Sequence, residues 1–145
     1  MKDFGDQNKF NKKSEKISKT IKPSKEHIYN QAIQFHSKGN IAEAAKYYQY
    51  FIKQGFRDFG VFSNYGVILR GLGKLKEAEF CYRKAIEINP NFYKAHFNLG
   101  NVMKDLGKLK EAELSYLKAI EINPDFADAY SNLGNALRDL GNLHK

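Results

Sequence analysis

Residues 75–92 read LKEAEFCYRKAIEINPNF, and residues 109–126 read LKEAELSYLKAIEINPDF. The second stretch repeats the first after 34 residues, and the units that contain them, 59–92 and 93–126, match at 19 of 34 positions without a gap. A fixed period of this length indicates a repeat protein in which each repeat is one supersecondary unit. The chain divides into units 25–58, 59–92 and 93–126, followed by a partial unit at 127–145.

Each unit is predicted to form two helices. In the third unit, apolar residues at helical spacing occupy one side of residues 93–106, and a second such stretch covers 109–122. Gly107 lies between them and is expected to end the first helix in a left-handed conformation. Pro124 cannot continue the second helix. Asn91 and Asp125, which follow the prolines, are expected to cap the next helix with a side-chain oxygen.

Small residues predict where the helices pack closely. Gly66, Gly100 and Gly134 fall in the middle of successive first helices, where glycine costs about 1 kcal/mol relative to alanine. A cost repeated at one position suggests a close approach of two backbones. The predicted opposite surface consists of alanines at two positions of each second helix, with a tyrosine in the wider gap: Ala78, Ala85, Tyr82, Ala112, Ala119 and Tyr116.

These landmarks resemble the tetratricopeptide (TPR) repeat. The third unit has every residue of the family pattern at its expected offset: His96, Leu99, Gly100, Met103, Ala112, Tyr116, Ala119 and Pro124. The resemblance implies an all-α fold, a right-handed superhelical solenoid of antiparallel helix pairs, with about three and a half repeats in residues 25–145. It also implies a concave groove, lined by the first helices, that binds peptides or proteins.

A column of asparagines is predicted to line this groove. The sixth position of every unit is asparagine: Asn30, Asn64, Asn98 and Asn132. The column is similar to the TPR domain of O-linked N-acetylglucosamine transferases, whose amides hydrogen-bond the backbone of an extended peptide. Asn101 and Asn135 belong to the same predicted site. The alternative is that these amides bond the neighbouring repeat and only stabilise the stack, and the two roles are compatible.

A second column, further along each first helix, is basic or potentially basic: His36, Arg70, Lys104 and Arg138. If these side chains face the groove, they favour an acidic or phosphorylated ligand. Asp105 and Asp139 partly cancel their field, and a solvated helix face is the alternative interpretation.

The carboxylate clamp of chaperone-binding TPR domains is not reproduced. It would require Lys and Asn where the first unit has Tyr29 and Ile33. One unit later, the same positions hold Ser63 and Val67, and Asp128 stands where a Lys is needed. The sequence therefore argues against binding of chaperone C-terminal tails.

Charge is concentrated at the N-terminus. Residues 1–24 carry seven Lys against three acidic residues, +4 of the chain's net +8, and form a predicted disordered basic tail. Such a tail could contact nucleic acid or an anionic membrane surface, but a flexible leader is the simpler interpretation.

Neither a cofactor nor a catalytic or metal site is predicted. The four histidines and the single cysteine, Cys81, lack the spacing of metal ligands, and no base–nucleophile pair is evident. No transmembrane segment or secretory signal is expected, and a cytoplasmic location is predicted.

The sequence thus predicts a non-catalytic interaction module, or scaffold, for an unidentified protein or peptide, with no small-molecule substrate. The alternative is the substrate-recruiting fragment of a larger, glycosyltransferase-like enzyme. The partial fourth unit predicts a frayed C-terminal helix, and it suggests either a fragment of a longer repeat protein or a chain shortened from one. Self-association through this incomplete repeat is a further possible interaction.

Overall fold

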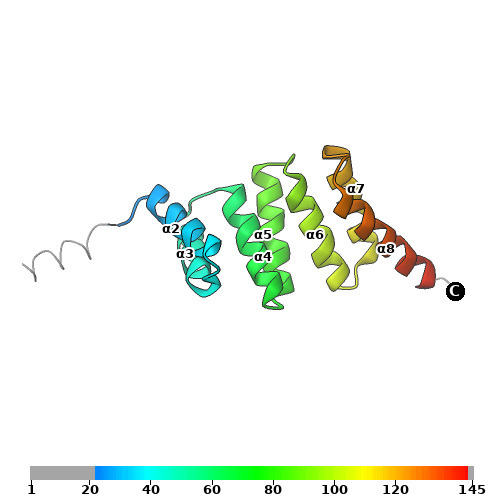
Figure 1. The fold of residues 1–145 in the computed structure, drawn as a ribbon, viewed down its shortest axis with the longest axis horizontal. Coiled ribbons are helices and arrows are strands. Elements are labelled where there is room, and N and C mark those ends of the chain that lie inside the picture. The colour runs from blue at the N-terminus through cyan, green and yellow to red at the C-terminus, as the bar shows by residue number, and fades with distance from the viewer. Residues whose placement is uncertain (1–21, 144–145) are drawn as a thin grey trace, which may run out of the picture.

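The computed structural model describes residues 22–143, and within them the chain forms seven α-helices and no strand. They are α2 (Lys25–Ser37), α3 (Ile41–Lys53), α4 (Phe59–Gly71), α5 (Leu75–Ile88), α6 (Tyr93–Asp105), α7 (Leu109–Ile122) and α8 (Ala127–Leu143). Figure 1 shows a row of helix pairs that runs from α2 and α3 to α8. The predicted all-α solenoid is confirmed. The predictions for the basic tail, apart from residues 22–24, lie outside the described residues.

Each first helix turns into its partner at a glycine, as the period predicts. Gly39, Gly73 and Gly107 have φ values of +77°, +75° and +75°. At Gly73 the turn is a Schellman motif, because the amide of Gly73 donates to the Arg70 carbonyl and the next amide donates to the Leu69 carbonyl. The left-handed glycine therefore reverses the chain, while the carbonyls of the last helical turn keep their hydrogen bonds.

The second helices end one residue before the Asn-Pro step. α5 ends at Ile88, and Pro90 follows Asn89. The capping role predicted for Asn91 is wrong, because α6 begins after Phe92, which makes no side-chain capping bond. Instead, the Asn89 side chain accepts from the backbone amide of Asn91, which folds the connection into a local turn. The His96 ring nitrogen donates to the Pro90 carbonyl at 2.8 Å and holds this turn against α6.

Two of the three mid-helix glycines, Gly66 and Gly100, mark close packing, but the nearest atoms belong to tyrosine rings rather than to the alanines. The prediction is wrong for Gly134, where an added Cβ would meet no atom within 4 Å. A Cβ added to Gly66 would lie 2.7 Å from the Tyr82 ring, and one added to Gly100 would lie 2.6 Å from the Tyr116 ring. Both rings are fully buried. Both α5 and α7 thus place a tyrosine ring against the backbone of the preceding first helix, where an added Cβ would be too close to the ring.

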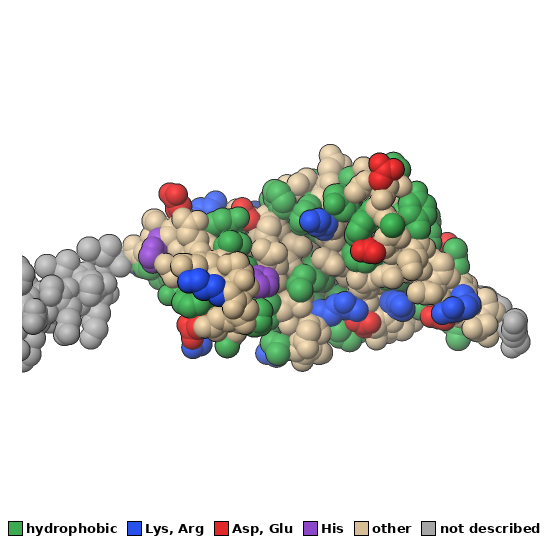
Figure 2. Space-filling model, in the orientation of Figure 1, with side chains coloured by type: hydrophobic (Ala, Val, Ile, Leu, Met, Phe, Trp, Pro, Cys, Tyr) green, Lys and Arg blue, Asp and Glu red, His purple; other side chains and the backbone are tan. Residues whose placement is uncertain are grey.

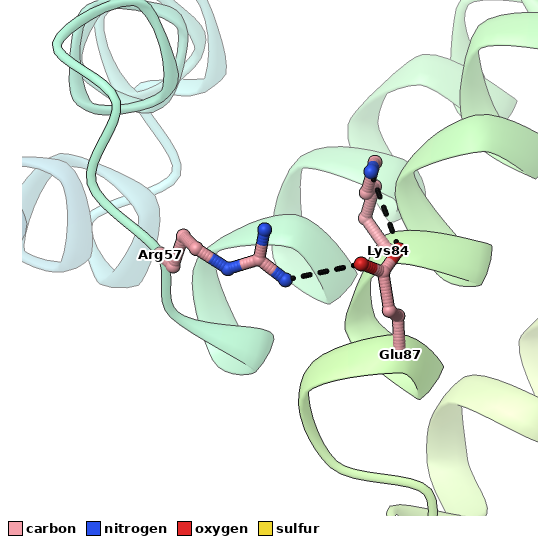
Figure 3. Close-up of polar contacts among 3 residues, drawn as sticks. All are labelled: Arg57, Lys84 and Glu87. Carbon is pink, nitrogen blue, oxygen red and sulfur yellow. Dashed lines mark hydrogen bonds and ion pairs between the residues drawn. The ribbon is translucent and has the colours of Figure 1, made fainter.

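The first pair connects to the second by a different turn. Gly55 has a φ of +80° where the later pairs have Asn-Pro. Arg57, two residues after Gly55, donates a hydrogen bond to the Glu87 carboxylate of α5 at 3.3 Å (Figure 3). Lys84 donates to the other oxygen of the same carboxylate at 3.2 Å. This ion pair ties the irregular loop to the second repeat.

At the other end, α8 passes through Gly141 and ends at Leu143. The period places Gly141 where Gly107 ends α6, but Gly141 does not adopt a positive φ. The described residues contain no helix after α8, so no packing interaction requires a reversal there. No described helix has the combination of length and apolar character that crossing a membrane requires.

The stack has an inner face made by the first helices. α4 contacts α6 and α6 contacts α8, whereas within the described residues the second helices of successive pairs do not approach one another to the same extent. A row that is closer on one side curves toward that side. The predicted site residues all lie on these first helices.

Candidate functional site

The asparagine column differs in exposure along the stack. Asn30 on α2 is exposed, whereas Asn64, Asn98 and Asn132 on the next three first helices are half-buried. The Tyr48 hydroxyl is hydrogen-bonded to the His36 ring at 2.8 Å, and burial, the largest effect on it, raises its pKa. The four amides therefore do not face equivalent surroundings.

Asn132 and Asn101 belong to one hydrogen-bond network between α6, α7 and α8. The amide oxygen of Asn101 accepts from the Tyr116 hydroxyl at 2.7 Å and from the Asn132 amide nitrogen at 2.8 Å. Asn101 is only 9% exposed. Burial raises the pKa of Tyr116 to about 12, so its hydroxyl stays protonated and donates. At this junction the amides bond the neighbouring repeat. Asn135, on the last first helix, is half-buried.

Two of the four residues in the basic column, Arg70 and Arg138, are paired with acidic residues. Arg70 Nε lies 2.7 Å from Asp105 Oδ2, which links α4 to α6 across two repeats. Arg138 lies 3.9 Å from its neighbour Asp139. Lys104 is half-buried and makes no ion pair within the described residues. On the face in Figure 2, basic and acidic side chains are likewise interspersed over the described part of the surface.

A polar pocket of about 380 Å³ lies around the Arg70–Asp105 pair. Its other walls are Tyr82 from α5 and Asn98 from α6, with Val67 and Gly71 on α4. Burial raises the pKa of the Tyr82 hydroxyl, so it remains a donor. The pocket is thus lined by a guanidinium, a carboxylate, a tyrosine and an amide. The charges of the guanidinium and the carboxylate cancel.

An apolar pocket of about 330 Å³ adjoins it toward the first repeat. Its lining combines residues of α2, α3, α4 and the turn after α4: His36, Ile41, Val67, Ile68, Gly71 and Leu72. Three of these are exposed large hydrophobic residues, with Ile41 at 41%, Val67 at 48% and Leu72 at 63%. The two pockets share Val67 and Gly71 as walls.

Sequence reasoning selected Arg70 and Asn98 but missed the apolar wall beside them. The signal lay in departures from the repeat. The position of Val67 holds Asn101 in the next unit, and the position of Gly71 holds Asp105 there. The change from apolar Ile33 and Val67 to Asn101 and Asn135, with Gly71 in an otherwise polar column, indicates a place where the inner face changes chemistry.

Outside the inner face, Cys81 lies at a third pocket, of about 340 Å³, between α3, α4 and α5. It is 4% exposed, and burial raises the pKa of its thiol to about 12. A protonated, buried thiol is a poor nucleophile. Within residues 22–143, no three side chains of His, Cys, Asp or Glu are grouped as metal ligands.

The helix pairs, turn glycines and buried tyrosines define the class of α-helical solenoid repeat proteins. The TPR repeat family profile matches residues 66–107 and 100–141, which together cover just over half of the chain. The chain belongs to the TPR repeat family. No curated protein sequence matches it.

Solved structures of TPR proteins have the same fold. MamA is 21% identical, with a TM-score of 0.79 over 97% of this chain and 86% of MamA. YrrB, described as a TPR protein with an unusual peptide-binding site, is 25% identical, with a TM-score of 0.75 over 82% of this chain and 61% of YrrB. The first TPR domain of Spaghetti (RPAP3), bound to an HSP90 peptide, is 22% identical, with a TM-score of 0.73 over 79% of this chain and 90% of that domain.

Proposed function

We propose that the chain is a non-catalytic interaction module that binds an extended segment of another protein on the inner face of residues 25–145. The observation that carries this proposal is the pair of adjoining pockets on that face, one polar and one apolar. Concave sites with an apolar lining and a few convergent polar groups are where ligands bind. Support also comes from YrrB and RPAP3, whose descriptions name a peptide-binding site and a bound peptide.

In this proposal the four asparagines of the column have different roles. Asn98 lines the polar pocket and is the strongest candidate for bonding a ligand backbone. Asn30 and Asn64 extend the column toward the first repeat. Asn132 uses its amide nitrogen on Asn101, so its main role is to hold α8 on α6. The similarity to the O-linked N-acetylglucosamine transferase column therefore applies, as a hypothesis, to the first three positions.

The expected ligand differs from a chaperone tail. Tyr29 and Ile33, which replace clamp residues, pack against the apolar core, and Tyr29 lies 6.4 Å from Phe51 between ring centroids. Ser63 is buried. These positions cannot hold a terminal carboxylate as a Lys and an Asn would.

The proposal is tested by selecting a random-sequence peptide library, displayed on phage, against the full chain. Selected peptides are then titrated by fluorescence anisotropy against the wild type and the Asn64→Ala/Asn98→Ala variant. Because one amide can donate and accept, we expect the variant to bind about tenfold or more weakly. Lys118→Ala, a change on the exposed side of α7, is the matched control and should leave binding unchanged.

Two results would contradict the proposal. One is a library that yields no peptide with saturable binding to the wild type. The other is a set of selected peptides that bind the double variant as tightly as the wild type, which would place the binding surface elsewhere.

A further inference from the structure

The two adjoining pockets differ in chemistry although the repeats that build them are similar. The polar pocket contains an ion pair, a hydroxyl and an amide, whereas the apolar pocket exposes Ile41, Val67 and Leu72. An exposed cluster of large apolar side chains on a soluble protein usually marks an interaction site. The difference between the pockets is therefore information about the ligand.

The polar pocket is suited to a neutral side chain. Arg70 Nε bonds Asp105 at 2.7 Å, so a ligand carboxylate would have to compete with Asp105 and would bring two like charges together. A ligand cation would face Arg70 in the same way. An amide or hydroxyl can accept from the remaining N–H groups of Arg70 and donate to Asp105, which leaves the ion pair intact.

Gly71 keeps the passage between the pockets open. A Cβ added there would meet no atom within 4 Å, and the residue is the last of α4, without a positive φ. The equivalent positions of the other units are Ser37, Asp105 and Asp139. Only in the second unit does this wall lack a side chain, so an extended ligand can pass from one pocket to the other over Gly71.

We propose that the inner face across the first three repeats selects an extended peptide by two residues, an aliphatic side chain in the apolar pocket and a neutral Asn, Gln, Ser or Thr side chain in the polar pocket. Alternate residues of an extended chain point the same way and lie about 7 Å apart, which suits adjoining pockets with a shared wall. The two residues therefore occupy positions i and i+2. This inference rests on the proposed function and specifies its ligand.

The test is the sequence preference of peptides selected from the same displayed library by the wild type and by Asp105→Asn. We expect the wild type to enrich an aliphatic residue two positions from Asn, Gln, Ser or Thr. Asp105→Asn releases Arg70 and should change the polar position to Asp or Glu. Asp139→Asn makes the same change one repeat later. Because Asp139 does not line the polar pocket, this variant should keep the wild-type preference.

A second pair of variants tests the shared wall. Gly71→Asp adds a carboxylate between the pockets without steric conflict and should weaken a selected peptide about tenfold or more. Gly71→Ala adds no charge and should stay within about twofold.

The outcomes separate the two proposals. Selection of acidic residues by the wild type, an unchanged preference in Asp105→Asn, or full binding by Gly71→Asp would overturn the two-pocket inference. If the same peptides still lost affinity in Asn64→Ala/Asn98→Ala, the proposed function would stand without it. A library with no binding peptide would overturn both.

Discussion

The tetrapeptide Asn-Leu-Gly-Asn occurs twice, at 98–101 in α6 and at 132–135 in α8, with different surroundings. In α6, Leu99 is 5% exposed and Gly100 lies under the Tyr116 ring. In α8, Leu133 is half-buried, and a Cβ on Gly134 would meet nothing within 4 Å. The same residues are core in one helix and more exposed in the other. α6 has α7 as its partner, which supplies the covering ring, whereas α8 packs on α7 and α6 but has no partner helix of its own among the described residues.

A first helix is therefore stabilised by the second helix of its own repeat as much as by its own sequence. Each mid-helix glycine is useful only when the next helix supplies a tyrosine. Variants that remove the tyrosine or fill the glycine should therefore have large effects in α6 and α7 and small effects in α8.

Removal of the covering ring is expected to have the largest effect. Tyr116→Ala deletes a fully buried ring and leaves Asn101 without its hydroxyl donor, so we expect a loss of about 3–5 kcal/mol in the free energy of unfolding. Tyr130→Ala on α8, where the side chain is 49% exposed, should cost about 0.5 kcal/mol. Urea unfolding followed by circular dichroism measures both, and equal losses would contradict the comparison.

The glycines should respond with opposite signs. Gly100→Ala places a Cβ 2.6 Å from the Tyr116 ring and should destabilise the fold by about 1–3 kcal/mol. Gly134→Ala meets no neighbour and should stabilise α8 by up to about 1 kcal/mol, through helix propensity alone. Thermal unfolding of the two variants provides the measurement. A stabilised Gly100→Ala variant would mean that the ring does not pack on that glycine.

Hydrogen exchange should distinguish the same two regions without substitution. Amides of α8, residues 127–143, are expected to exchange on the order of tenfold faster than those of residues 66–88, because no described helix follows α8, so it can open without unfolding a further repeat. Equal protection in the two segments, measured by mass spectrometry on the intact chain, would show that α8 is as firmly held as the interior.

The smallest expected effect is electrostatic and concerns the first junction. Hydrogen bonds from Lys84 and then from Arg57 lower the pKa of the Glu87 carboxyl. A lowered folded pKa stabilises the fold above the ordinary carboxyl pKa, and this contribution disappears as the pH falls through the folded value. Glu87→Gln should therefore lower the Tm slightly at neutral pH, and this effect should shrink as the pH falls below the ordinary Glu pKa of about 4.3.

The matched control is Glu121, which pairs with Lys118 in its own helix and has no arginine partner from another repeat among the described contacts. Glu121→Gln should change the neutral-pH Tm less than Glu87→Gln does. If Glu121→Gln lowered the Tm more than Glu87→Gln does, the hydrogen bond from Arg57 would not contribute to stability as proposed.

The period predicted the helix pairs and the turns at Gly39, Gly73 and Gly107, because a repeated residue in a repeated setting adopts a repeated conformation. The same inference failed at Gly141. The glycine recurs there without a positive φ, and the described residues contain no helix after α8. The capping role of Asn91 was also wrong, since Asn89 organises that turn. Both errors come from inferring structure from local sequence where contacts with other segments decide it.

The candidate site was predicted in outline only. The sequence identified the asparagine and basic columns and the cancelling role of Asp105, but it could not show that Arg70 pairs with Asp105 of the adjacent repeat. Nor could it show that Val67 and Gly71 form the wall between two pockets, because that depends on how α3, α5 and α6 surround α4.

The most direct test of the account is a nitrogen-15 NMR titration of the full chain with a peptide selected from the library. We predict that the largest chemical-shift changes fall on the inner face, at Val67, Gly71 and Asn98, and that the outer residues Phe80 and Leu114 hardly change. Changes concentrated at Phe80 and Leu114 instead would show that the ligand binds the second helices, and would contradict the central claim that the inner face is the binding surface.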